Sequence, residues 1–525
     1  MKLIPRPVEY AVKEGKVGWN SLTQVTGDFP ETSALAKELL AKKAAGRESR
    51  LHFTSDSRFA PEGYAIKSDK NVIQVLASSE AGAFYALMSL EQMGEGGEMD
   101  CCFVRDEPKY SYRSFQLDCS RHFWTVEKIK SILRLQASVK MNTFHWHLSD
   151  DQGWRAEIKK YPLLTEKGSI RKNTQIGLVG YNAGKEPHDD EEYGRGMFYT
   201  QEDMKEVVAY AKKLHIQVIP EIDMPGHMVA AIACYPELSC TGEPTEVSTR
   251  WGVMDNICCC GKENIYNFAK DVIDELCEIF PAPYFHIGGD EAPKTRWKTC
   301  PKCQAKIKEL GLKDENALQG YFNNEMAKYL RTKGKRMIGW NEVLDAADIM
   351  DKDVIAQWWV YRGSKTRELG WLEKGGNLIL SMWGYVYMDH PYNVRPLSKT
   401  YKMTADKLGI KDKKGVIGVE CPQWCEYIRT EEKFDFISFA RIITVAEIAW
   451  TPDYRMDYKG FEERLEALRP FFESRGWYIP PQKVYRGKAR DFKTLTYAGR
   501  WNTWRIDPYW EVKWTKKNFG EILKK

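Results

Sequence analysis

The sequence predicts an α/β protein, a (β/α)8 TIM barrel preceded by a small α+β domain. Three observations support this fold class. Apolar segments of strand length recur eight times between residues 114 and 421, amphipathic segments of helical period separate them, and polar side chains collect where the apolar segments end. A doubly wound open sheet is the alternative. It is less favoured because no glycine-rich phosphate-binding fingerprint follows a first strand.

Three regions follow each other along the chain. Residues 1–108 alternate short polar strands with one helix-like segment at 81–93, which is typical of a small α+β domain. The pattern of apolar residues changes at about residue 109, and we assign 109–470 to the barrel. Residues 471–525 form a basic, Trp-rich C-terminal extension that we expect to pack on the barrel.

The barrel prediction rests on particular segments. The eight expected strands are 114–120, 141–148, 216–223, 284–291, 336–342, 353–359, 377–382 and 415–421. Helical periods are clearest at 126–140, 203–215 and 264–280. Two long polar insertions, 171–196 and 240–260, follow strand ends, and loops at those ends build the sites of barrel enzymes.

Composition indicates a globular chain. Of the 525 residues, 43% are hydrophobic and 29% charged, enough to bury a core and too apolar for disorder. No run of about 18 apolar residues exists, so we expect no membrane span. The first residues contain no signal-peptide core, which favours the cytoplasm as the chain reads, or the periplasm or secretion if a leader was removed.

The C-terminal extension raises the question of nucleic acid. Residues 483–525 contain 12 Lys or Arg and 4 Asp or Glu, together with Trp501, Trp504, Trp510 and Trp514. Basic residues interleaved with aromatics can bind nucleic acid. We favour the simpler interpretation, in which the Trp rings pack on a neighbouring domain and the Lys side chains stay in water. No nucleic-acid partner is expected.

The 13 cysteines do not have the spacing of a disulfide framework. Cys300-Pro-Lys-Cys303 resembles one half of a zinc knuckle, but no second pair of matching spacing exists. We therefore interpret it as a loop that carries thiols. The sequence does not decide whether one disulfide forms there. Neither a metal nor a cofactor is expected. Reduced thiols fit a non-oxidising compartment.

Polar residues follow almost every expected strand, on the rim where barrel active sites lie. One chemistry this allows is metal-dependent hydrolysis. His145 and His147 are two apart on a strand and point to one side, and His227 and His286 could complete a ligand shell. Barrel hydrolases of that kind usually carry His-x-His on the first strand, whereas here it is on the second. We favour hydrogen-bonded histidines below a pocket.

Glycoside cleavage is the other chemistry. In the stretch YFHIGGDEAPKTRW, a strand ends in Gly288 and Gly289 and is followed by Asp290 and Glu291. Adjacent carboxylates cannot easily straddle a sugar ring, as the usual two-carboxylate mechanism requires. They suit substrate-assisted hydrolysis, in which the 2-acetamido oxygen of the sugar attacks its own anomeric carbon. One acid then protonates the leaving group, and the other holds the amide.

The chain resembles the family-20 glycoside hydrolases, the β-N-acetylhexosaminidases, over residues 109–450. The motifs that carry the resemblance are YRSFQLDCSRHFW, KMNTFHWHLSDDQGWRAEIKKYPLLTEKG, EIDMPGH, HIGGDE, IGWNE, YVYMD and QWCEY. Residues 1–108 resemble the small N-terminal domain of that family. The resemblance implies a retaining exo-glycosidase that removes terminal non-reducing β-linked GlcNAc, or GalNAc, from oligosaccharides or glycoconjugates.

The resemblance also implies a role for each matching residue. Among the catalytic residues, Glu291 would be the general acid and then the base, Asp290 would orient the acetamido N–H, Tyr387 would donate to the acetamido oxygen, and Asp150 and His227 would position the pair. The substrate-binding residues would be Arg113 and Glu426 at the 3- and 4-hydroxyls, Asp389 at the 4- and 6-hydroxyls, and Trp340, Trp358 and Trp424 as walls.

One motif departs from the family pattern. The family often reads small-Asn-Leu-Trp-x-Glu near the eighth strand, where this chain reads Cys-Pro-Gln-Trp-Cys-Glu at 421–426. The sequence does not distinguish GlcNAc from GalNAc, and it identifies neither the aglycone nor the oligomeric state.

Overall fold

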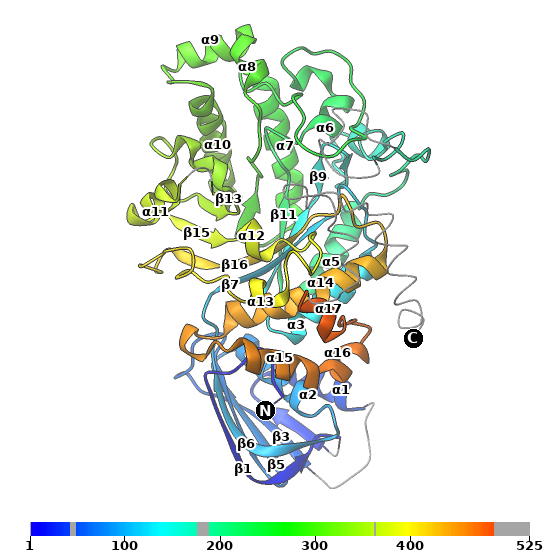
Figure 1. The fold of residues 1–525 in the computed structure, drawn as a ribbon, viewed down its shortest axis with the longest axis vertical. Coiled ribbons are helices and arrows are strands. Elements are labelled where there is room, and N and C mark those ends of the chain that lie inside the picture. Colours follow the sequence, from blue (N-terminus) through cyan, green and yellow to red (C-terminus); the bar gives the residue numbers. More distant parts are fainter. Residues whose placement is uncertain (1, 21, 42–48, 176–187, 362–363, 488–525) are drawn as a thin grey trace.

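A computed structural model describes residues 2–20, 22–41, 49–175, 188–361 and 364–487. An N-terminal sheet lies at one end of the long axis and a barrel at the other, with the C-terminal helices α15 (Tyr458–Ala467) and α16 (Arg469–Glu473) at the junction (Figure 1). None of the described helices combines the length and the apolar character that crossing a membrane requires.

The N-terminal domain is a six-stranded sheet with helices. Its strand order is β1-β6-β4-β5-β3-β2, and most neighbours are antiparallel. The elements are β1 (Glu9–Gly18), β2 (Leu22–Gly27), α1 (Pro30–Ala41), β3 (Ser49–Ser55), β4 (Tyr64–Asp69), β5 (Val72–Ala77), α2 (Glu80–Met93) and β6 (Glu98–Asp106). The predicted helix at 81–93 is α2, whose N-terminus is capped by the Ser79 hydroxyl.

Eight parallel strands close into a barrel in the order β11-β12-β13-β14-β15-β16-β7-β8. The strands are β7 (Tyr112–Asp118), β8 (Thr143–His147), β11 (Gln217–Glu221), β12 (Tyr284–His286), β13 (Arg336–Trp340), β14 (Ile355–Trp358), β15 (Asn377–Leu380) and β16 (Val416–Gln423). The predicted barrel is confirmed, and each expected apolar segment overlaps one strand. Parallel strands buried on both faces read as apolar runs, which is why these segments could be recognised.

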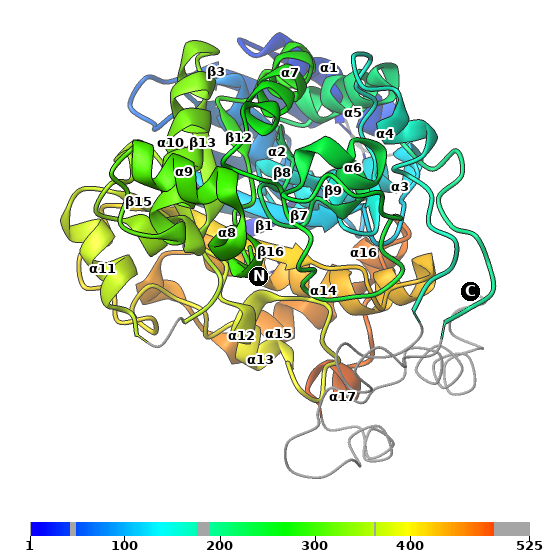
Figure 2. The same ribbon diagram turned by 90° about the horizontal axis from the view of Figure 1, so that it is seen from above.

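Helices surround the strands, as the view from above shows (Figure 2). They include α3 (Val126–Ser138), α5 (Gln201–Lys213), α7 (Glu263–Ile279), α10 (Glu315–Thr332), α11 (Thr366–Glu373) and α14 (Glu431–Trp450). The helical periods at 126–140, 203–215 and 264–280 became α3, α5 and α7. Thr200 and Asp203 form a capping box that fixes the start of α5.

Short elements complete the described chain, and most lie in the loops between the barrel strands and helices. They are β9 (Ser149–Asp150), β10 (Gly153–Trp154), α4 (Leu163–Glu166), α6 (Val229–Cys234), η1 (Pro236–Leu238), α8 (Thr295–Thr299), α9 (Pro301–Glu309), η2 (Asn341–Ala346), α12 (Trp383–Val386), α13 (Leu397–Thr400), η3 (Asp453–Arg455) and α17 (Gln482–Tyr485), where η denotes a 3-10 helix.

The interior of the barrel is filled in layers. Side chains on the strands, with Ala282 just before β12, form an apolar cluster separate from the main core. It consists of Tyr112, Ile219, Ala282, Ile338, Ile355 and Ile379. Because side chains alternate along a strand, residues two positions further on point the same way. Glu221 follows Ile219 in this manner and begins a polar layer. The barrel is therefore a packed core with polar groups toward its C-terminal end.

The beginning of the C-terminal extension packs at the domain junction. Arg475 pairs with Glu91 (2.9 Å) and Glu95 (3.1 Å) in and just after α2, and Trp477 is buried. The prediction for residues 488–525, including Trp501, Trp504, Trp510 and Trp514, lies outside the described residues.

Arg113 joins the two domains and does not reach a sugar site. It is at the N-terminal end of β7, fully buried, and its guanidinium donates to Glu62 of the N-terminal domain at 2.7 and 2.9 Å. The same group donates to the Lys140 carbonyl and lies over the Trp450 ring. The substrate-binding role expected for Arg113 is therefore wrong, because that end of a barrel strand faces away from the rim.

We expect Arg113→Ala to lower the free energy of unfolding by about 3–5 kcal/mol, because it leaves the Glu62 carboxylate without its cationic partner and creates a buried cavity. Arg58→Ala is the matched control, since its partner is also an acid, Asp56, but the Arg58 side chain is 83% exposed. Urea unfolding of both variants measures the difference. Equal, small shifts for the two would contradict a structural role for Arg113.

Candidate active site

A cavity of about 450 Å³ opens at the C-terminal end of the barrel, a typical size for a small-molecule site. Eight of the predicted site residues line it, and they come from loops that follow different strands. The lining residues are Arg121, Asp150, His227, Asp290, Glu291, Trp359, Trp383, Tyr387, Asp389, His390, Trp424, Glu426 and Tyr427.

Two glycines turn the adjacent acids into this cavity. β12 ends at His286, and Gly288 and Gly289 then adopt φ values of +67° and +95°. A Cβ on Gly288 would lie 1.8 Å from Asp223 Oδ1, so the backbone approaches that carboxyl as only glycine permits. Glu291 also has a positive φ, of +44°, which is costly for a residue with a side chain. The strained turn lets neighbouring carboxylates face one cavity.

The two acids have different surroundings. Asp290 is only 8% exposed, and burial raises the pKa of its carboxyl to about 6. Its Oδ1 accepts no hydrogen bond from any described residue, although a buried carboxylate oxygen normally has a donor. The Glu291 side chain is 38% exposed and points into the open part of the cavity. Asp290 is thus placed to receive a donor from a bound molecule, and Glu291 to exchange protons.

His227 lies behind both acids. Its Nε2 is 3.9 Å from Asp290 Oδ2 and 3.8 Å from Glu291 Oε2, while its Nδ1 is 3.1 Å from Asp150 Oδ1. Burial alone would lower the pKa of His227, but the carboxylates of Asp150 and Asp151 outweigh it and hold that pKa well above the usual value. His227 is therefore a cation, and it stabilises the ionised form of Asp290.

Asp150 connects this cation to the barrel interior. His147 Nε2 is 2.9 Å from Asp150 Oδ2, and His147 Nδ1 is 2.5 Å from Glu221 Oε2. Arg121 Nη2 is 2.7 Å from the same Asp150 oxygen. Burial would raise the pKa of Asp150, but Arg121 and His227 keep it well below the usual range. Asp150 is thus a permanent anion that orients His227.

The histidines proposed above for a metal site belong to this layer. His145 Nδ1 is 2.9 Å from Glu420 Oε1 and its Nε2 is 3.1 Å from Glu221 Oε2, while His286 Nδ1 is 3.0 Å from Glu221 Oε1. Although His145, Glu221 and His286 lie close enough to share an ion, each ring is engaged by a carboxylate beneath the cavity. This arrangement fits the favoured interpretation of hydrogen-bonded histidines below the pocket.

Aromatic rings form one wall of the cavity. Tyr387 stacks on Trp359 with ring centres 5.9 Å apart and an angle of 15° between the planes, and Trp424 lies 6.2 Å from Tyr387. Burial raises the pKa of Tyr387 well above its usual value, so its phenol keeps its proton and can donate a hydrogen bond.

Another part of the lining, next to Trp424, forms a polar wall. Arg121 lies over the Trp424 ring, 5.1 Å from its centre, and burial raises the pKa of the neighbouring Glu426 to about 7. Asp389 Oδ1 accepts no hydrogen bond from the described residues. Burial lowers the pKa of the adjacent His390 to about 4, so this ring is neutral at neutral pH. The wall offers acceptors and a guanidinium, a combination that suits hydroxyl groups.

Two predicted tryptophans lie outside the cavity. Trp340 is fully buried in the layer beneath, where its Nε1 donates to Glu221 Oε1 at 2.9 Å and its ring contacts Trp424. Trp358 points away from the barrel axis, because the preceding residue on β14, Gln357, points inward and donates to Ser381. Trp359, which the sequence analysis passed over, faces the cavity instead.

Arg121 is the other important residue that the sequence analysis missed. It follows the C-terminal end of β7, whereas Arg113 lies at the N-terminal end of that strand. The position of Arg121 in the sequence could have indicated its role, since functional residues of a barrel lie at the C-terminal ends of strands and not at their N-terminal ends. Arg121 therefore occupies the cavity position that had been expected of Arg113.

Comparisons with known proteins agree with this geometry. The family described as "Glycosyl hydrolase family 20, catalytic domain" matches residues 110–453, and "Glycosyl hydrolase family 20, domain 2" matches residues 1–107. A Beta-hexosaminidase of Porphyromonas gingivalis is 34% identical over 94% of this chain. The chain spans 66% of that relative's length, just under two thirds.

Solved structures also resemble this chain in fold and in sequence. A GH20 exo beta-N-acetylglucosaminidase from Vibrio harveyi, in complex with N-acetylglucosamine, superposes with a TM-score of 0.80 at 30% identity, over 91% of this chain and 78% of that one. The beta-N-acetylhexosaminidase from Bacteroides fragilis gives a TM-score of 0.79 at 30% identity, over 92% of this chain and 98% of that one.

We expect Gly288→Ala to lower the free energy of unfolding by at least about 1–3 kcal/mol, because its φ is left-handed and its Cβ would collide with Asp223. Gly370→Ala is the control. It lies within α11, where a Cβ meets nothing within 4 Å, and we expect no loss or a gain of about 0.4–1 kcal/mol. Urea unfolding measures both, and a Gly288→Ala protein as stable as the wild type would contradict the strained turn.

Proposed function

The chain belongs to glycosyl hydrolase family 20, and from that premise we propose that it is a retaining exo-β-N-acetylhexosaminidase. It removes terminal non-reducing β-linked GlcNAc, or GalNAc, by substrate-assisted catalysis. The observation that carries the proposal is the Asp290–Glu291 pair, in which a buried carboxylate oxygen without a donor lies beside a half-exposed acid in one cavity.

Asp290 acts on the acetamido group of the sugar. Its buried carboxylate accepts the amide N–H, which makes the amide oxygen more nucleophilic. The cationic His227 keeps Asp290 ionised at neutral pH, above its pKa of about 6. Tyr387 donates to the acetamido oxygen and fixes its direction of attack. Trp359 and Trp424 flank Tyr387 and enclose the acetyl methyl group.

Glu291 moves the proton. In the first step the acetamido oxygen forms a bond to the anomeric carbon, the bond from that carbon to the leaving oxygen breaks, and Glu291 gives its proton to the leaving oxygen. In the second step water attacks the anomeric carbon from the vacated side and loses a proton to Glu291 as the oxazoline-type ring opens. Two displacements at one carbon leave its configuration unchanged.

The polar wall holds the sugar hydroxyls. Arg121 and Glu426 are placed for the 3- and 4-hydroxyls, and Asp389 for the 4- and 6-hydroxyls. A carboxylate accepts from hydroxyls but cannot donate. Because the cavity is closed beneath by the polar layer around Glu221, it suits one terminal sugar, as an exo-acting enzyme requires.

The direct test is hydrolysis of 4-nitrophenyl β-GlcNAc, with the first-formed anomer followed by proton NMR. We expect the β-anomer first, strong inhibition by a thiazoline mimic of the cyclised intermediate, and about 10²-fold lower kcat for Asp290→Asn. Asp345→Asn, a surface change that leaves the cavity intact, should retain wild-type activity. A thiazoline that binds no better than free GlcNAc would rule out substrate assistance.

We expect Glu291→Gln to lose most turnover on substrates with basic leaving groups and less on those with acidic ones, since general-acid catalysis matters most for a basic leaving oxygen. A series of aryl β-GlcNAc substrates, compared by kcat/KM in wild type and variant, measures this dependence. Equal losses along the series would mean that Glu291 is not the proton donor.

A further inference from the structure

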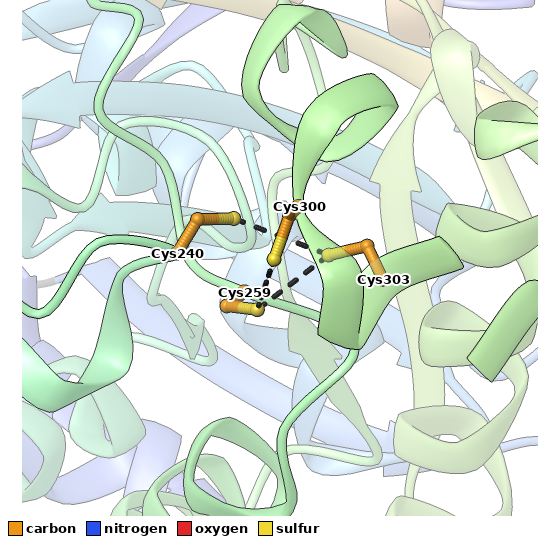
Figure 3. Close-up of side chains that lie close together, drawn as sticks. All are labelled: Cys240, Cys259, Cys300 and Cys303. Carbon is orange, nitrogen blue, oxygen red and sulfur yellow. Dashed lines mark hydrogen bonds between the residues drawn. The ribbon is translucent and has the colours of Figure 1, made fainter. Parts of the chain in front are cut away.

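Four cysteines from separate parts of the chain meet near the catalytic loops. Cys240 and Cys259 stand at the two ends of the second polar insertion, and Cys300 and Cys303 stand at the start of α9. Figure 3 shows the four side chains pointing toward one another, with sulfurs facing a common centre. All four sulfurs lie within 4.8 Å of one another.

The separations match a tetrahedral metal site. The Sγ atoms of Cys259 and Cys303 are 3.5 Å apart, those of Cys259 and Cys300 are 3.7 Å apart, and those of Cys240 and Cys303 are 3.9 Å apart. With Zn–S bonds of about 2.3 Å, the edges of a tetrahedron of sulfurs are about 3.8 Å long. A disulfide requires about 2.05 Å. The four thiols are unbonded, and the Cys259 sulfur is within 3.7 Å of two partners, Cys300 and Cys303.

The surrounding backbone is built for this approach. Ser239 and Cys258 form an antiparallel bridge, and the Cys259 N–H donates to the Leu238 carbonyl at 2.8 Å, so the ends of the insertion are held together. Gly261 lies so close to the other loop that a Cβ there would be 2.4 Å from the Cys303 nitrogen. Glycine is therefore required where the two loops meet.

The start of α9 also favours thiolates. Cys300 is the N-cap, Pro301 occupies the first turn, and Cys303 lies three residues after the cap. Free N–H groups at a helix N-terminus stabilise negative charge and lower the pKa of cysteine thiols. Cys259 and Cys303 are fully buried and Cys300 is 6% exposed, so a bound ion would be shielded from water.

We propose that Cys240, Cys259, Cys300 and Cys303 bind one zinc ion in a tetrahedral, structural site. Four protein thiolates close the coordination shell, which leaves no position for water or substrate and separates this site from the hydrolytic chemistry. The site goes beyond the proposed glycosidase function, and it differs from the expectation, drawn from the sequence, that no metal is bound. Cys240 and Cys259 supply the second half of the zinc knuckle, although 18 residues separate them.

The ion would fasten the two loops that carry the catalytic residues. The Cys258 N–H donates to the Pro225 carbonyl at 3.0 Å, two residues before His227. The Trp297 Nε1 donates to the Cys258 carbonyl at 2.9 Å, and Trp297 lies on the segment between Glu291 and Cys300. The site thereby links the His227 loop to the Asp290–Glu291 loop without contacting the cavity.

Metal analysis of the purified full chain tests the proposal. We expect one zinc per chain by inductively coupled plasma mass spectrometry, without added metal. Replacement by cobalt should produce thiolate charge-transfer bands and the intense visible bands of tetrahedral Co²⁺. Non-reducing mass spectrometry that finds two disulfides and no metal would overturn the proposal, and stoichiometric iron in place of zinc would overturn the identity of the ion.

Variants locate the ion. We expect Cys303→Ser and Cys240→Ser to lose at least half of the bound zinc and to unfold at lower temperature than the wild type. Cys277→Ser is the control, because Cys277 is a partly buried thiol on α7 outside the cluster, and it should keep one zinc. If Cys303→Ser does not fold, the cobalt spectrum of the wild type still tests the proposal, because the absence of thiolate charge-transfer bands would contradict cysteine ligands. Full zinc content in Cys240→Ser and Cys303→Ser would refute the site.

Discussion

The hydrogen-bonded chain from Glu221 through His147 and Asp150 to His227 is the interaction on which the site depends. Each link is buried, and each is about 2.5–3.1 Å long. Its first member comes from a barrel strand and its last member stands 3.8 Å from Glu291. The packed interior of the barrel therefore sets the position of a charge beside the Asp290–Glu291 pair. Hydrogen bonds behind the residues that line the cavity hold those loop residues in a precise geometry.

The hydrogen-bonded chain from Glu221 to His227 also balances the charges of the site. Several carboxyls share a small volume, and burial opposes the ionisation of each of them. Arg121 and the cationic His227 offset Asp150 and Asp290, while the pKa of Asp223 rises well above its usual value through burial and the charge of Asp290. Asp290 is thus kept ionised at neutral pH while its deeper neighbour Asp223 stays neutral. Burial and pairing, and not residue type, assign these states.

Much of this could be predicted from the sequence. Buried parallel strands leave apolar runs, so the barrel could be predicted. His-x-Gly-Gly-Asp-Glu indicated the acid pair because it stands at a strand end and occurs together with the other motifs that carry the family resemblance. The position of Arg113 required attention to strand direction, and the choice between Trp358 and Trp359 required knowing which side of β14 faces inward. The meeting of Cys240 with Cys303 could not be read, because it depends on a bridge between distant loops.

The closed floor of the cavity has a consequence for how long glycans would be degraded. The apolar cluster around Ile219 and the polar layer above it leave no passage through the barrel. A released sugar can leave only through the mouth by which the chain end entered, and the shortened chain stands in that mouth. If the proposed function holds, the glycan would therefore dissociate after every cut, and degradation would be distributive and not processive. Polymers would be trimmed together, one residue at a time, and free monosaccharide would compete with the next chain end.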